Sequence, residues 1–421
     1  MHTLEQIAEL ERQYLLPTYN RYPIAFSRGK GVFLYDLEGN RYLDFVSGLG
    51  VNALGHAHPR IVKTIREQAS KLVHISNLYY HEYQGPLAEK LCQLAGGSSG
   101  AGSTGAAPAT GAPATKFRAF FSNSGTEAIE GSIKLARLAG HRAGGAAKCR
   151  LVALDGSYHG RTFGALSLTG QDKHRKGFEP LLEEVTFVKQ NDLESLRAAI
   201  NDETCAIVLE PVFGEGGIYE CSVEFLQECR ALADKHRAAL IFDEIQCGLG
   251  RTGTIFAFQS FGVVPDMVAI AKPIAAGLPL GAFLAKEEFA TAISAGQHGT
   301  TFGGGPLACR VALEFLAIVE EEKLLENVNK VGAYLHQELK SVVEKRSAAV
   351  GVRGRGFIQG IQLEIPARPV VDEGLAEGVL FNSTQDTVVR FLPPFLLEEK
   401  HVDKGIRVLK KLLGKKRKKA A

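Results

Sequence analysis

The sequence predicts an α/β protein built on a mostly parallel sheet with helices on its faces, together with a smaller α+β domain. Two observations predict the sheet. Short apolar runs alternate with helical patterns through the middle of the chain, and the runs are rich in Val, Ile, Phe and Leu without regular alternation. Such runs are typical of parallel strands buried on both faces. A third observation predicts the smaller domain: after about residue 305 the pattern changes to long amphipathic helix and short strands.

Six apolar runs are predicted to be strands of the large sheet. They are KFRAFF (116–121), CRLVALD (149–155), EVTFVKQ (184–190), CAIVLEP (205–211), AALIFDE (238–244) and DMVAIAK (266–272). In such sheets, ligands bind at the carboxyl ends of the strands. The polar residues that end the runs are therefore the first functional candidates: Asn123, Asp155, Glu210, Asp243 and Lys272.

The smaller domain is expected to draw on both ends of the chain. Residues 307–345 read as one long amphipathic helix, and short strands are expected within 351–364 and 387–394. Residues 31–45 have the pattern of a β-hairpin with Glu38, Gly39 and Asn40 in its turn. We expect residues 1–60 to join the small domain, residues 61–305 to form the large domain, and residues 306–421 to complete the small one.

Composition and charge argue against several classes of function. The chain has 421 residues, is 45% hydrophobic and 23% charged, and carries a net charge of +3. These values indicate a globular protein of two or three domains without a dedicated nucleic-acid partner. Seven scattered cysteines without a CxxC pair are typical of reduced thiols in the cytoplasm. The N-terminal sequence MHTLEQIAELERQ has no apolar signal segment, so secretion is not expected.

Three segments invite other interpretations. Residues 267–285 are long enough to span a membrane, but they contain Lys272 and two prolines, and no second such segment exists, so no span is expected. Residues 95–115 are small, uncharged and rich in Gly, Ala, Ser, Thr and Pro, which predicts a flexible surface insertion. The basic run GKKRKK (414–419) predicts a solvated chain end, with contact to nucleic acid or an anionic surface as the alternative.

The segment FSNSGTEAIE (121–130) predicts a turn from a strand into a helix. Ser124 and Glu127 have the spacing of a capping box. Small residues at a helix N-terminus leave backbone N–H groups pointing into open space, where the helix dipole also favours an anion. We call this predicted anion site, formed by Ser124, Gly125 and Thr126, the cup. The segment is neither a P-loop nor GxGxxG, so a nucleotide is not the favoured anion. A plain strand–helix turn is the alternative.

Two further segments place polar groups at strand ends. Asp243 and Glu244 end a strongly apolar run, and one of them is expected to face the ligand edge of the sheet. No His/Cys cluster is nearby, so a metal is not expected, and a helix-capping carboxylate is the alternative. In SYHGRT (157–162), Tyr158 can stack on a planar ligand and Arg161 can bind a carboxylate through two hydrogen bonds. His159 is expected to be structural.

Lys272 follows a strand-like run and precedes a turn rich in Pro, Gly and Ala. One interpretation is a surface lysine at a strand end. The other is a partly desolvated lysine, whose amine is more often neutral and therefore nucleophilic. Pyridoxal phosphate needs a phosphate cup, a stacking aromatic, an anion opposite its pyridine nitrogen and a lysine. The order of cup, Tyr158, Asp243 and Lys272 along successive strand ends fits that cofactor.

Motifs extend this pattern along nearly the whole chain. They are DLEGNRYLDFVSGLGVNALGHAHP (36–59), FFSNSGTEAIEGSIKLAR (120–137), YHGRT (158–162), LEPVFGEGG (209–217), IFDEIQCGLGRTG (241–253), AIAKPIAAGLPLGA (269–282), HGTTFGGGPLAC (298–309) and VVRFLPP (388–394). In this order they resemble the class III pyridoxal-phosphate aminotransferases of fold type I. The resemblance implies a seven-stranded sheet and a cytoplasmic homodimer. It also implies transfer of the ω-amino group of N-acetylornithine to 2-oxoglutarate, a step of arginine biosynthesis.

The resemblance also implies roles for individual residues. Lys272 would form the internal aldimine and move the substrate proton, and Asp243 would pair with the protonated pyridine nitrogen. The other cofactor contacts would be Gln246 near the ring oxygen, Gly125 and Thr126 at the phosphate, Tyr158 over the ring, and Thr301 at the phosphate of the neighbouring subunit. The substrate contacts would be Arg161 and Arg390, which bind carboxylates, and Thr300. Glu215 would act as a gate: it would neutralise an arginine while the amino donor is bound and release it for 2-oxoglutarate. Glu210 would support the site.

The sequence departs from the family pattern at a few positions, and other functions fit it less well. Phe213 stands where many relatives have Gln, Gly305 where many have Asn, and Ala275 with Ala276 where a Gly pair is usual. Within the family, ornithine, succinylornithine and 4-aminobutyrate are alternative amino donors. A nucleotide-dependent oxidoreductase would need a glycine fingerprint that the sequence lacks. A non-catalytic binding or scaffold protein would not explain Lys272 and Asp243 at strand ends.

Overall fold

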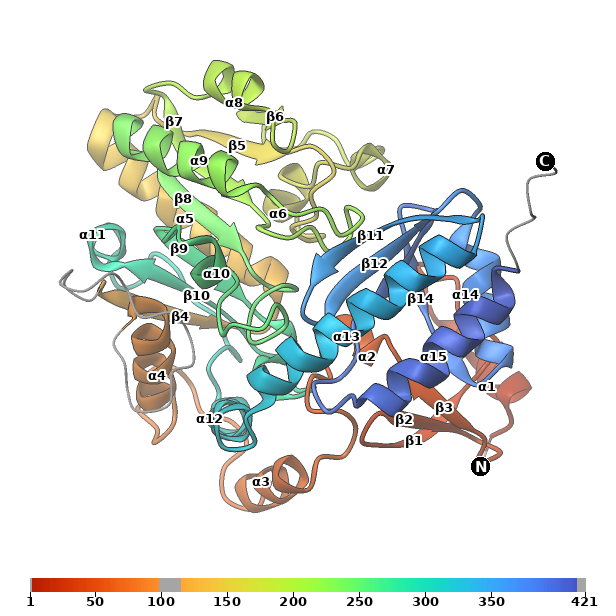
Figure 1. Cartoon of the computed structure of the whole chain (residues 1–421). Coiled ribbons are helices and arrows are strands. Elements are labelled where there is room, and N and C mark those ends of the chain that lie inside the picture. Colours follow the sequence, from red (N-terminus) through yellow and green to blue (C-terminus); the bar gives the residue numbers. More distant parts are fainter. Residues whose placement is uncertain (1, 98–114, 415–421) are drawn as a thin grey trace, which may run out of the picture.

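A seven-stranded sheet forms the centre of the larger lobe of the computed structural model, which describes residues 2–97 and 115–414 (Figure 1). Its strands lie in the order β4 (Phe117–Ser122), β10 (Gly281–Lys286), β9 (Met267–Ile270), β8 (Ala239–Asp243), β7 (Thr204–Leu209), β5 (Arg150–Leu154) and β6 (Val185–Val188). Every pairing from β9 to β6 is parallel. All six predicted strands are therefore confirmed, and the fold class with them.

The apolar runs did not locate the seventh strand, β10. It runs antiparallel between β9 and β4, with Ala282 opposite both Ile270 and Phe121. The apolar segment 267–285 folds back on itself through the short 3₁₀ helix η1 (Lys272–Ala275), and the turn continues through Ala276 at φ 48° and Gly277 at φ 110°. No helix among the described residues is long and apolar enough to cross a membrane.

Helices cover both faces of the sheet (Figure 1). On one face, α5 (Gly125–Gly144) contributes Ile129 and Ile133 to a buried cluster that includes Ile241 of β8. On the other face, α9 (Val223–His236) contributes Phe225 to a cluster that includes Phe242 of the same strand. Adjacent residues of one strand thus point to opposite faces and are both buried, which explains the absence of polar alternation in the sequence. The larger lobe also contains α3 (Pro59–Ala69), α4 (Gln84–Gly96), α6 (Phe163–Ser167), α7 (Asp172–Arg175), α8 (Leu193–Ala199), α10 (Phe258–Phe261) and α11 (Glu287–Ala290).

The smaller lobe joins the two ends of the chain. One sheet has the order β1 (Phe26–Lys30), β2 (Phe33–Asp36), β3 (Arg41–Asp44) and β13 (Val379–Leu380), and the other has β11 (Ala349–Arg355), β12 (Ile358–Leu363), β15 (Val388–Phe391) and β14 (Asn382–Thr384). Its helices include α1 (Leu4–Tyr14), α2 (Ser47–Gly50), α14 (Ala367–Ala376) and α15 (Glu399–Leu412). The parallel pairing of β13 with β3 joins residues near the start of the chain to residues near its end, and the division at residues 60 and 305 stays a prediction.

The predicted hairpin and the predicted long helix had different outcomes. β2 and β3 form the hairpin, and the Asp36 carboxylate stabilises its turn by accepting the Glu38 and Asn40 N–H groups at 3.0 and 2.8 Å. The single helix over 307–345 is wrong, because the structure has α12 (Pro306–Glu321) and α13 (Leu324–Lys345) there. Lys323 between them adopts a left-handed φ of 51°, which an α-helix does not tolerate.

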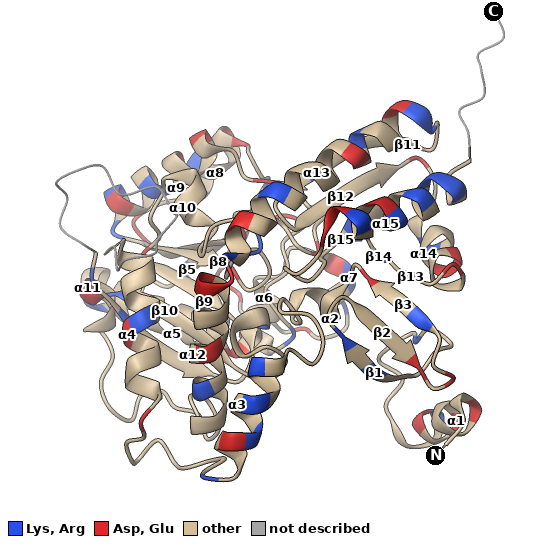
Figure 2. Cartoon of the chain, turned by 60° about the horizontal axis from the view of Figure 1, so that its bottom comes forward, with Lys and Arg blue, Asp and Glu red and all other residues tan. Residues whose placement is uncertain are grey.

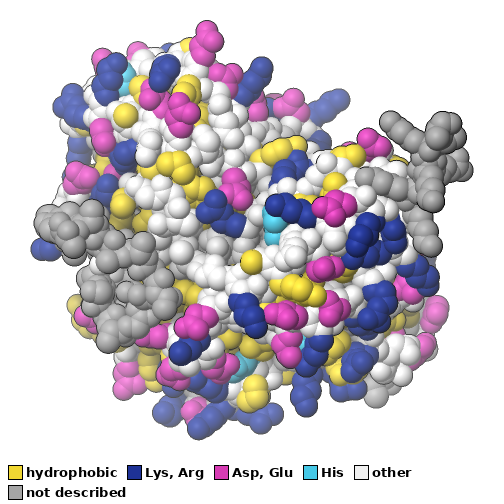
Figure 3. Space-filling view, viewed as in Figure 1, with side chains coloured by type: hydrophobic (Ala, Val, Ile, Leu, Met, Phe, Trp, Pro, Cys, Tyr) yellow, Lys and Arg dark blue, Asp and Glu magenta, His cyan; other side chains and the backbone are white. Residues whose placement is uncertain are grey.

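The surface carries charges of both signs on both lobes (Figure 2). On the face shown in Figure 3, Lys and Arg side chains are interspersed with Asp and Glu. This distribution agrees with the small net charge of +3. Most of the predicted insertion at 95–115, and all but Gly414 of the basic run, lie outside the described residues.

The loop that follows β8 is held by a buried carboxyl group. Glu244 is completely buried, and its two oxygens accept the N–H groups of Ala257 and Phe258 at 2.6 and 2.7 Å. It therefore anchors the start of α10 and faces away from the ligand edge. Burial raises the pKa of Glu244 from its ordinary 4.5 to about 8, because the charged form has lost its water.

We expect the Glu244 carboxyl to make stability depend on pH. A raised folded-state pKa means that its contribution is complete below pH 4.5 and is lost as pH rises to about 8. The slope from this group is about 1.4 kcal/mol per pH unit. Urea unfolding at several pH values should show this decline in the wild type and a shallower one in Glu244→Gln. Equal slopes in the two proteins would contradict the assignment.

Candidate active site

The carboxyl edge of the large sheet gathers the predicted site residues. Asp243 ends β8, Lys272 begins η1 directly after β9, and Glu210 follows β7. The N-terminus of α5 follows β4 at the same edge. The smaller lobe reaches this edge, since Arg390 of β15 donates to the Gly214 carbonyl at 2.9 Å. The site therefore lies where the two lobes meet.

Asp243 is held rigidly although it is only 3% exposed. Its Oδ2 lies 2.7 Å from His159 Nδ1, and its Oδ1 accepts the Ile245 N–H at 3.0 Å. His159 Nε2 is buried and has no hydrogen-bond partner among the described residues. Of the two carboxylates that end the β8 run, Asp243 is thus the one that faces the ligand edge. His159 has the structural role that was expected, and its partner is the catalytic candidate itself.

Lys272 is a half-buried lysine at the start of η1. No acceptor among the described residues lies within hydrogen-bond distance of its Nζ. Burial lowers the pKa of Lys272, and the charge of Arg390 adds to this, while the carboxylates of Glu215 and Asp243 oppose it. The lysine thus keeps a larger neutral fraction than a solvated lysine would, as a nucleophilic amine requires.

The start of α5 forms the predicted cup. Ser124 caps the helix by accepting the Glu127 N–H at 3.4 Å. The second half of the predicted capping box is wrong: the Glu127 carboxylate accepts the N–H and the side-chain amide of Asn123 instead, at 2.7 and 2.9 Å. No acceptor among the described residues bonds the N–H groups of Gly125 and Thr126. A Cβ on Gly125 would lie 2.7 Å from Ile245, so this close packing requires glycine.

The cup is supported by residues that the sequence interpretation missed. Thr126 Oγ1 lies 2.8 Å from Thr162 Oγ1, and the Thr162 hydroxyl donates to Glu130 at 2.6 Å. Glu130 also accepts the Gly164 N–H at 2.9 Å. This chain ties the YHGRT segment to α5. Its sequence signal was the spacing of Thr126 and Glu130 by one helical turn, which places both on one face of α5.

The same segment carries Tyr158 and Arg161. Tyr158 is half-buried, and its N–H donates to Glu210 at 2.9 Å. The exposed Arg161 lies over the Tyr158 ring at 5.7 Å and donates to its hydroxyl at 3.3 Å. Glu210 also accepts the Gly214 N–H at 2.8 Å. Burial raises the pKa of Glu210, and the nearby charge of Asp243 adds to this. Glu210 thus supports two loops of the site, as expected.

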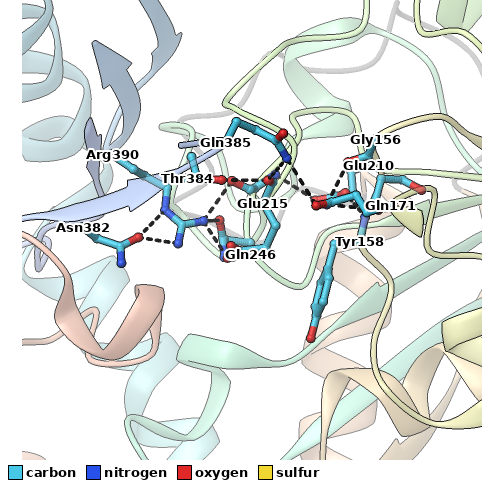
Figure 4. Close-up of polar contacts among 12 residues, drawn as sticks. Gly156, Tyr158, Gln171, Glu210, Glu215, Gln246, Asn382, Thr384, Gln385 and Arg390 are labelled. Atoms are coloured by element: carbon cyan, nitrogen blue, oxygen red, sulfur yellow. Dashed lines mark hydrogen bonds and ion pairs between the residues drawn. The ribbon is translucent and has the colours of Figure 1, made fainter. Parts of the chain in front are cut away.

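Arg390 and Glu215 form an ion pair between the lobes (Figure 4). The guanidinium is 1% exposed, and its Nη1 lies 2.6 Å from Glu215 Oε1. The same nitrogen donates to Gln246 Oε1 at 3.1 Å. Burial pushes the pKa of Glu215 up, but the charge and hydrogen bond of Arg390 outweigh it and hold the pKa at about 2. Glu215 is therefore ionised at neutral pH.

Three remaining candidates lie at the margin of this site. Thr300 is half-buried and its Oγ1 accepts from the Asn123 side chain at 3.1 Å. Thr301 is exposed. Asp155 is exposed as well, and among the described residues only its backbone is engaged, with Gly170 and Val188. The structure therefore gathers Asn123 with Thr300 beside the cup and leaves Asp155 without a side-chain role.

Comparisons with known proteins agree with this arrangement. Residues 15–413 match the family model for class-III aminotransferases. Acetylornithine aminotransferase from Aquifex aeolicus is 43% identical to this chain, and the match covers 95% of this chain and 100% of that protein. Acetylornithine aminotransferase from Methanocaldococcus jannaschii is 42% identical, and the match covers 96% of this chain and 97% of that protein. The structure of ornithine aminotransferase from Toxoplasma gondii ME49 has a TM-score of 0.89 at 27% identity, covering 98% of this chain and 95% of that one. The structure of acetylornithine aminotransferase from Elizabethkingia anophelis has a TM-score of 0.83 at 28% identity, and the match covers 98% of this chain and 99% of that one.

The fold, with a lysine and a buried aspartate at the carboxyl edge of its sheet, is that of a fold type I pyridoxal-phosphate enzyme. The chain belongs to the class-III aminotransferases. Its cofactor is therefore pyridoxal phosphate. The site fits this group. Within residues 2–97 and 115–414, the N–H groups of Gly125 and Thr126 have no acceptor and suit a phosphate, and Lys272 Nζ has no competing acceptor. The buried carboxylate of Asp243 suits a protonated ring nitrogen.

We expect the hydroxyl of Thr162 to matter for cofactor affinity. Thr162→Val keeps the shape of the side chain but removes the hydroxyl that links Thr126 to Glu130. This loss should weaken pyridoxal phosphate binding about tenfold. Titration of the apoprotein, followed by absorbance, measures the dissociation constant. Thr162→Ser is the matched control and should bind as the wild type does. Wild-type affinity in the valine variant would show that the hydroxyl chain is irrelevant to the cup.

Proposed function

We propose that this chain transfers the ω-amino group of N-acetylornithine to 2-oxoglutarate in two successive half-reactions. The observation that carries the proposal is the meeting of Lys272, Asp243, the α5 N-terminus and the Arg390–Glu215 pair at one sheet edge. Curated relatives at 43% and 42% identity over nearly the full chain are acetylornithine aminotransferases, which supports the choice of amino donor. Pyridoxal phosphate, when bound, supplies an aldehyde that accepts the amino group and a ring that takes up negative charge.

Several residues would hold the cofactor. The N-terminus of α5, through Gly125 and Thr126, would bind the phosphate, and Tyr158 would cover one face of the ring. Asp243 would keep a proton on the pyridine nitrogen, which its 2.7 Å contact with His159 and its burial favour by fixing the carboxylate in place. Gln246 would lie near the ring oxygen, from a side chain already ordered by Arg390 at 3.1 Å.

Lys272 would transfer the proton in the reaction. Its lowered pKa gives a neutral amine that can accept a proton from the reacting carbon of the substrate and return it to the neighbouring position. The absence of a hydrogen-bond acceptor for Nζ among the described residues leaves this amine free to move between the two positions. Arg161, exposed beside Tyr158, would bind the substrate carboxylate, with Thr300 nearby.

The Arg390–Glu215 pair would let one site accept two unlike substrates. With the pair closed at 2.6 Å, Glu215 cancels the charge of Arg390 for an amino donor that offers no carboxylate there. With Glu215 turned away, Arg390 would bind a carboxylate of 2-oxoglutarate. Ornithine, succinylornithine and 4-aminobutyrate remain the alternative donors, since Arg161 does not select what caps the α-nitrogen of ornithine.

The reaction is tested with Lys272→Ala and a choice of donors. The variant should lose turnover and the visible absorbance of the lysine-bound cofactor, because Lys272 supplies the amine that both depend on. In the wild type, N-acetylornithine should react faster than free ornithine when glutamate formation is measured. If Lys272→Ala kept both properties, the site assignment would fail. If ornithine were the better donor, only the choice of substrate would change.

We further propose a cytoplasmic homodimer in which Thr301 contacts the phosphate bound by the partner. Asn77 bonds the carbonyls of Thr300 and Gly303 at 3.1 and 3.0 Å, so the segment around it lies against the Thr301 loop. Both segments expose apolar side chains: Leu78 is 86% and Phe302 67% exposed, and Tyr80 is fully exposed. Large apolar side chains gathered in this way are typical of a protein interface.

Sedimentation of the holoenzyme should therefore give twice the mass of one chain. Tyr80→Asp places a charge in the proposed interface and should yield monomers that bind the cofactor more weakly, because the partner no longer supplies Thr301. Tyr19→Asp is the matched control, since Tyr19 is 76% exposed but lies in a different part of the chain. It should remain dimeric. A monomeric wild type would refute the dimer.

A further inference from the structure

We propose that Asn382 is a positioning residue that holds the side edge of the Arg390 guanidinium, so that the carboxylate of 2-oxoglutarate binds on the adjacent end edge once Glu215 turns away. The inference rests on the proposed function, since it assumes that Arg390 receives the keto acid. It concerns how the guanidinium stays in place when its ion-pair partner leaves.

Strand pairing sets Asn382 beside Arg390. β14 and β15 are antiparallel, and Asn382 lies directly opposite Arg390 in their register. Side chains of directly opposed residues project on the same face and touch. Thr384, two residues on, shares that face, whereas Ser383 points to the other one. Figure 4 shows Asn382 beside the Arg390 guanidinium and Thr384 beside Glu215.

The hydrogen-bond inventory of Arg390 shows which edge is occupied. A guanidinium has five N–H donors: one on Nε and two on each terminal nitrogen. Asn382 Oδ1 accepts from Nε at 3.0 Å and from Nη2 at 2.6 Å, which takes up the side edge. Nη1 serves the Glu215 carboxylate, the Gln246 oxygen and the Gly214 carbonyl. Among the described residues, no acceptor uses the second N–H of Nη2.

The open position therefore lies on the end edge, between Nη1 and Nη2. When Glu215 leaves, Nη1 loses one of its three acceptors, and an oxygen of the incoming carboxylate can take that place beside the unused N–H of Nη2. A carboxylate can then accept one hydrogen bond from each nitrogen, which is the strong paired geometry for arginine. Asn382 keeps the side edge engaged throughout, so the guanidinium does not have to be reoriented at each half-reaction.

The same short segment also limits how Glu215 can move. The Thr384 hydroxyl and the Gln385 side-chain amide both donate to the Glu215 backbone carbonyl, at 2.7 and 2.8 Å. The backbone of Glu215 is thus tied to β14, and its side chain, 29% exposed, is the part free to rotate. One strand end therefore holds the guanidinium of Arg390 and the backbone of its partner.

The test separates the two half-reactions. Apoprotein loaded with pyridoxamine phosphate is mixed with 2-oxoglutarate, and the cofactor absorbance gives the keto-acid affinity without any assumption about the amino donor. Asn382→Ala should weaken this affinity about tenfold, as expected for losing hydrogen bonds to a charged group. The holoenzyme mixed with N-acetylornithine should change by less than about threefold, because Asn382 does not contact that substrate in the proposed scheme.

Two further variants keep the test decisive. Ser383→Ala alters the same strand on its other face and should match the wild type in both half-reactions. Asn382→Asp preserves both contacts with Arg390 and the fold, but its charge competes with the incoming carboxylate, so it too should weaken 2-oxoglutarate binding. Unchanged keto-acid affinity in either Asn382 variant, or an equal loss in both half-reactions of Asn382→Ala, would overturn the proposal. A wild type that ignores N-acetylornithine but reacts with 2-oxoglutarate would refute only the choice of amino donor.

Discussion

The buried carboxylate of Asp243 is the constraint on which the site depends. A charge that is 3% exposed at the end of a central strand is unfavourable unless fixed partners surround it. His159 and the Ile245 N–H supply two of them. Ile245 in turn packs against Gly125 and so sets where α5 begins. The position of the anion cup therefore follows from how the carboxylate beside it is held.

The second constraint is the junction between the lobes, and buried arginines form it. Arg251, in the loop after β8, is completely buried and donates to the carbonyls of Gly50, Phe357 and Pro393. Burial lowers its pKa to about 9. Arg390 reaches in the opposite direction, from the smaller lobe to Gly214. Because each guanidinium bonds backbone carbonyls of the other lobe, the lobes are held in the orientation that closes the site around Lys272.

The departures from the family pattern occur at positions of different consequence. Phe213, where the resemblance leads us to expect Gln, is 2% exposed and belongs to the buried core, so it adds apolar packing beside the Glu215 loop. Ala276 takes a left-handed φ of 48° just after Lys272, a conformation that costs an alanine roughly 1 kcal/mol. A glycine would avoid that strain. The turn therefore positions Lys272 at some cost in stability, as is common near catalytic groups.

The sequence alone determined six of the seven strands of the large sheet, the polar residues at their ends, and the lysine and aspartate at two of those ends. These features depend on local patterns: an apolar run followed by a polar residue and a turn predicts the end of a strand regardless of what packs around it. Tertiary structure decided the rest. β10 was hidden inside an apolar segment because its direction depends on pairing with β4 and β9. The partners His159 for Asp243 and Asn382 for Arg390 were equally invisible in the sequence. Each is a contact between side chains whose spacing is set by sheet order, strand register and helix packing, and these arise only when the whole chain is folded.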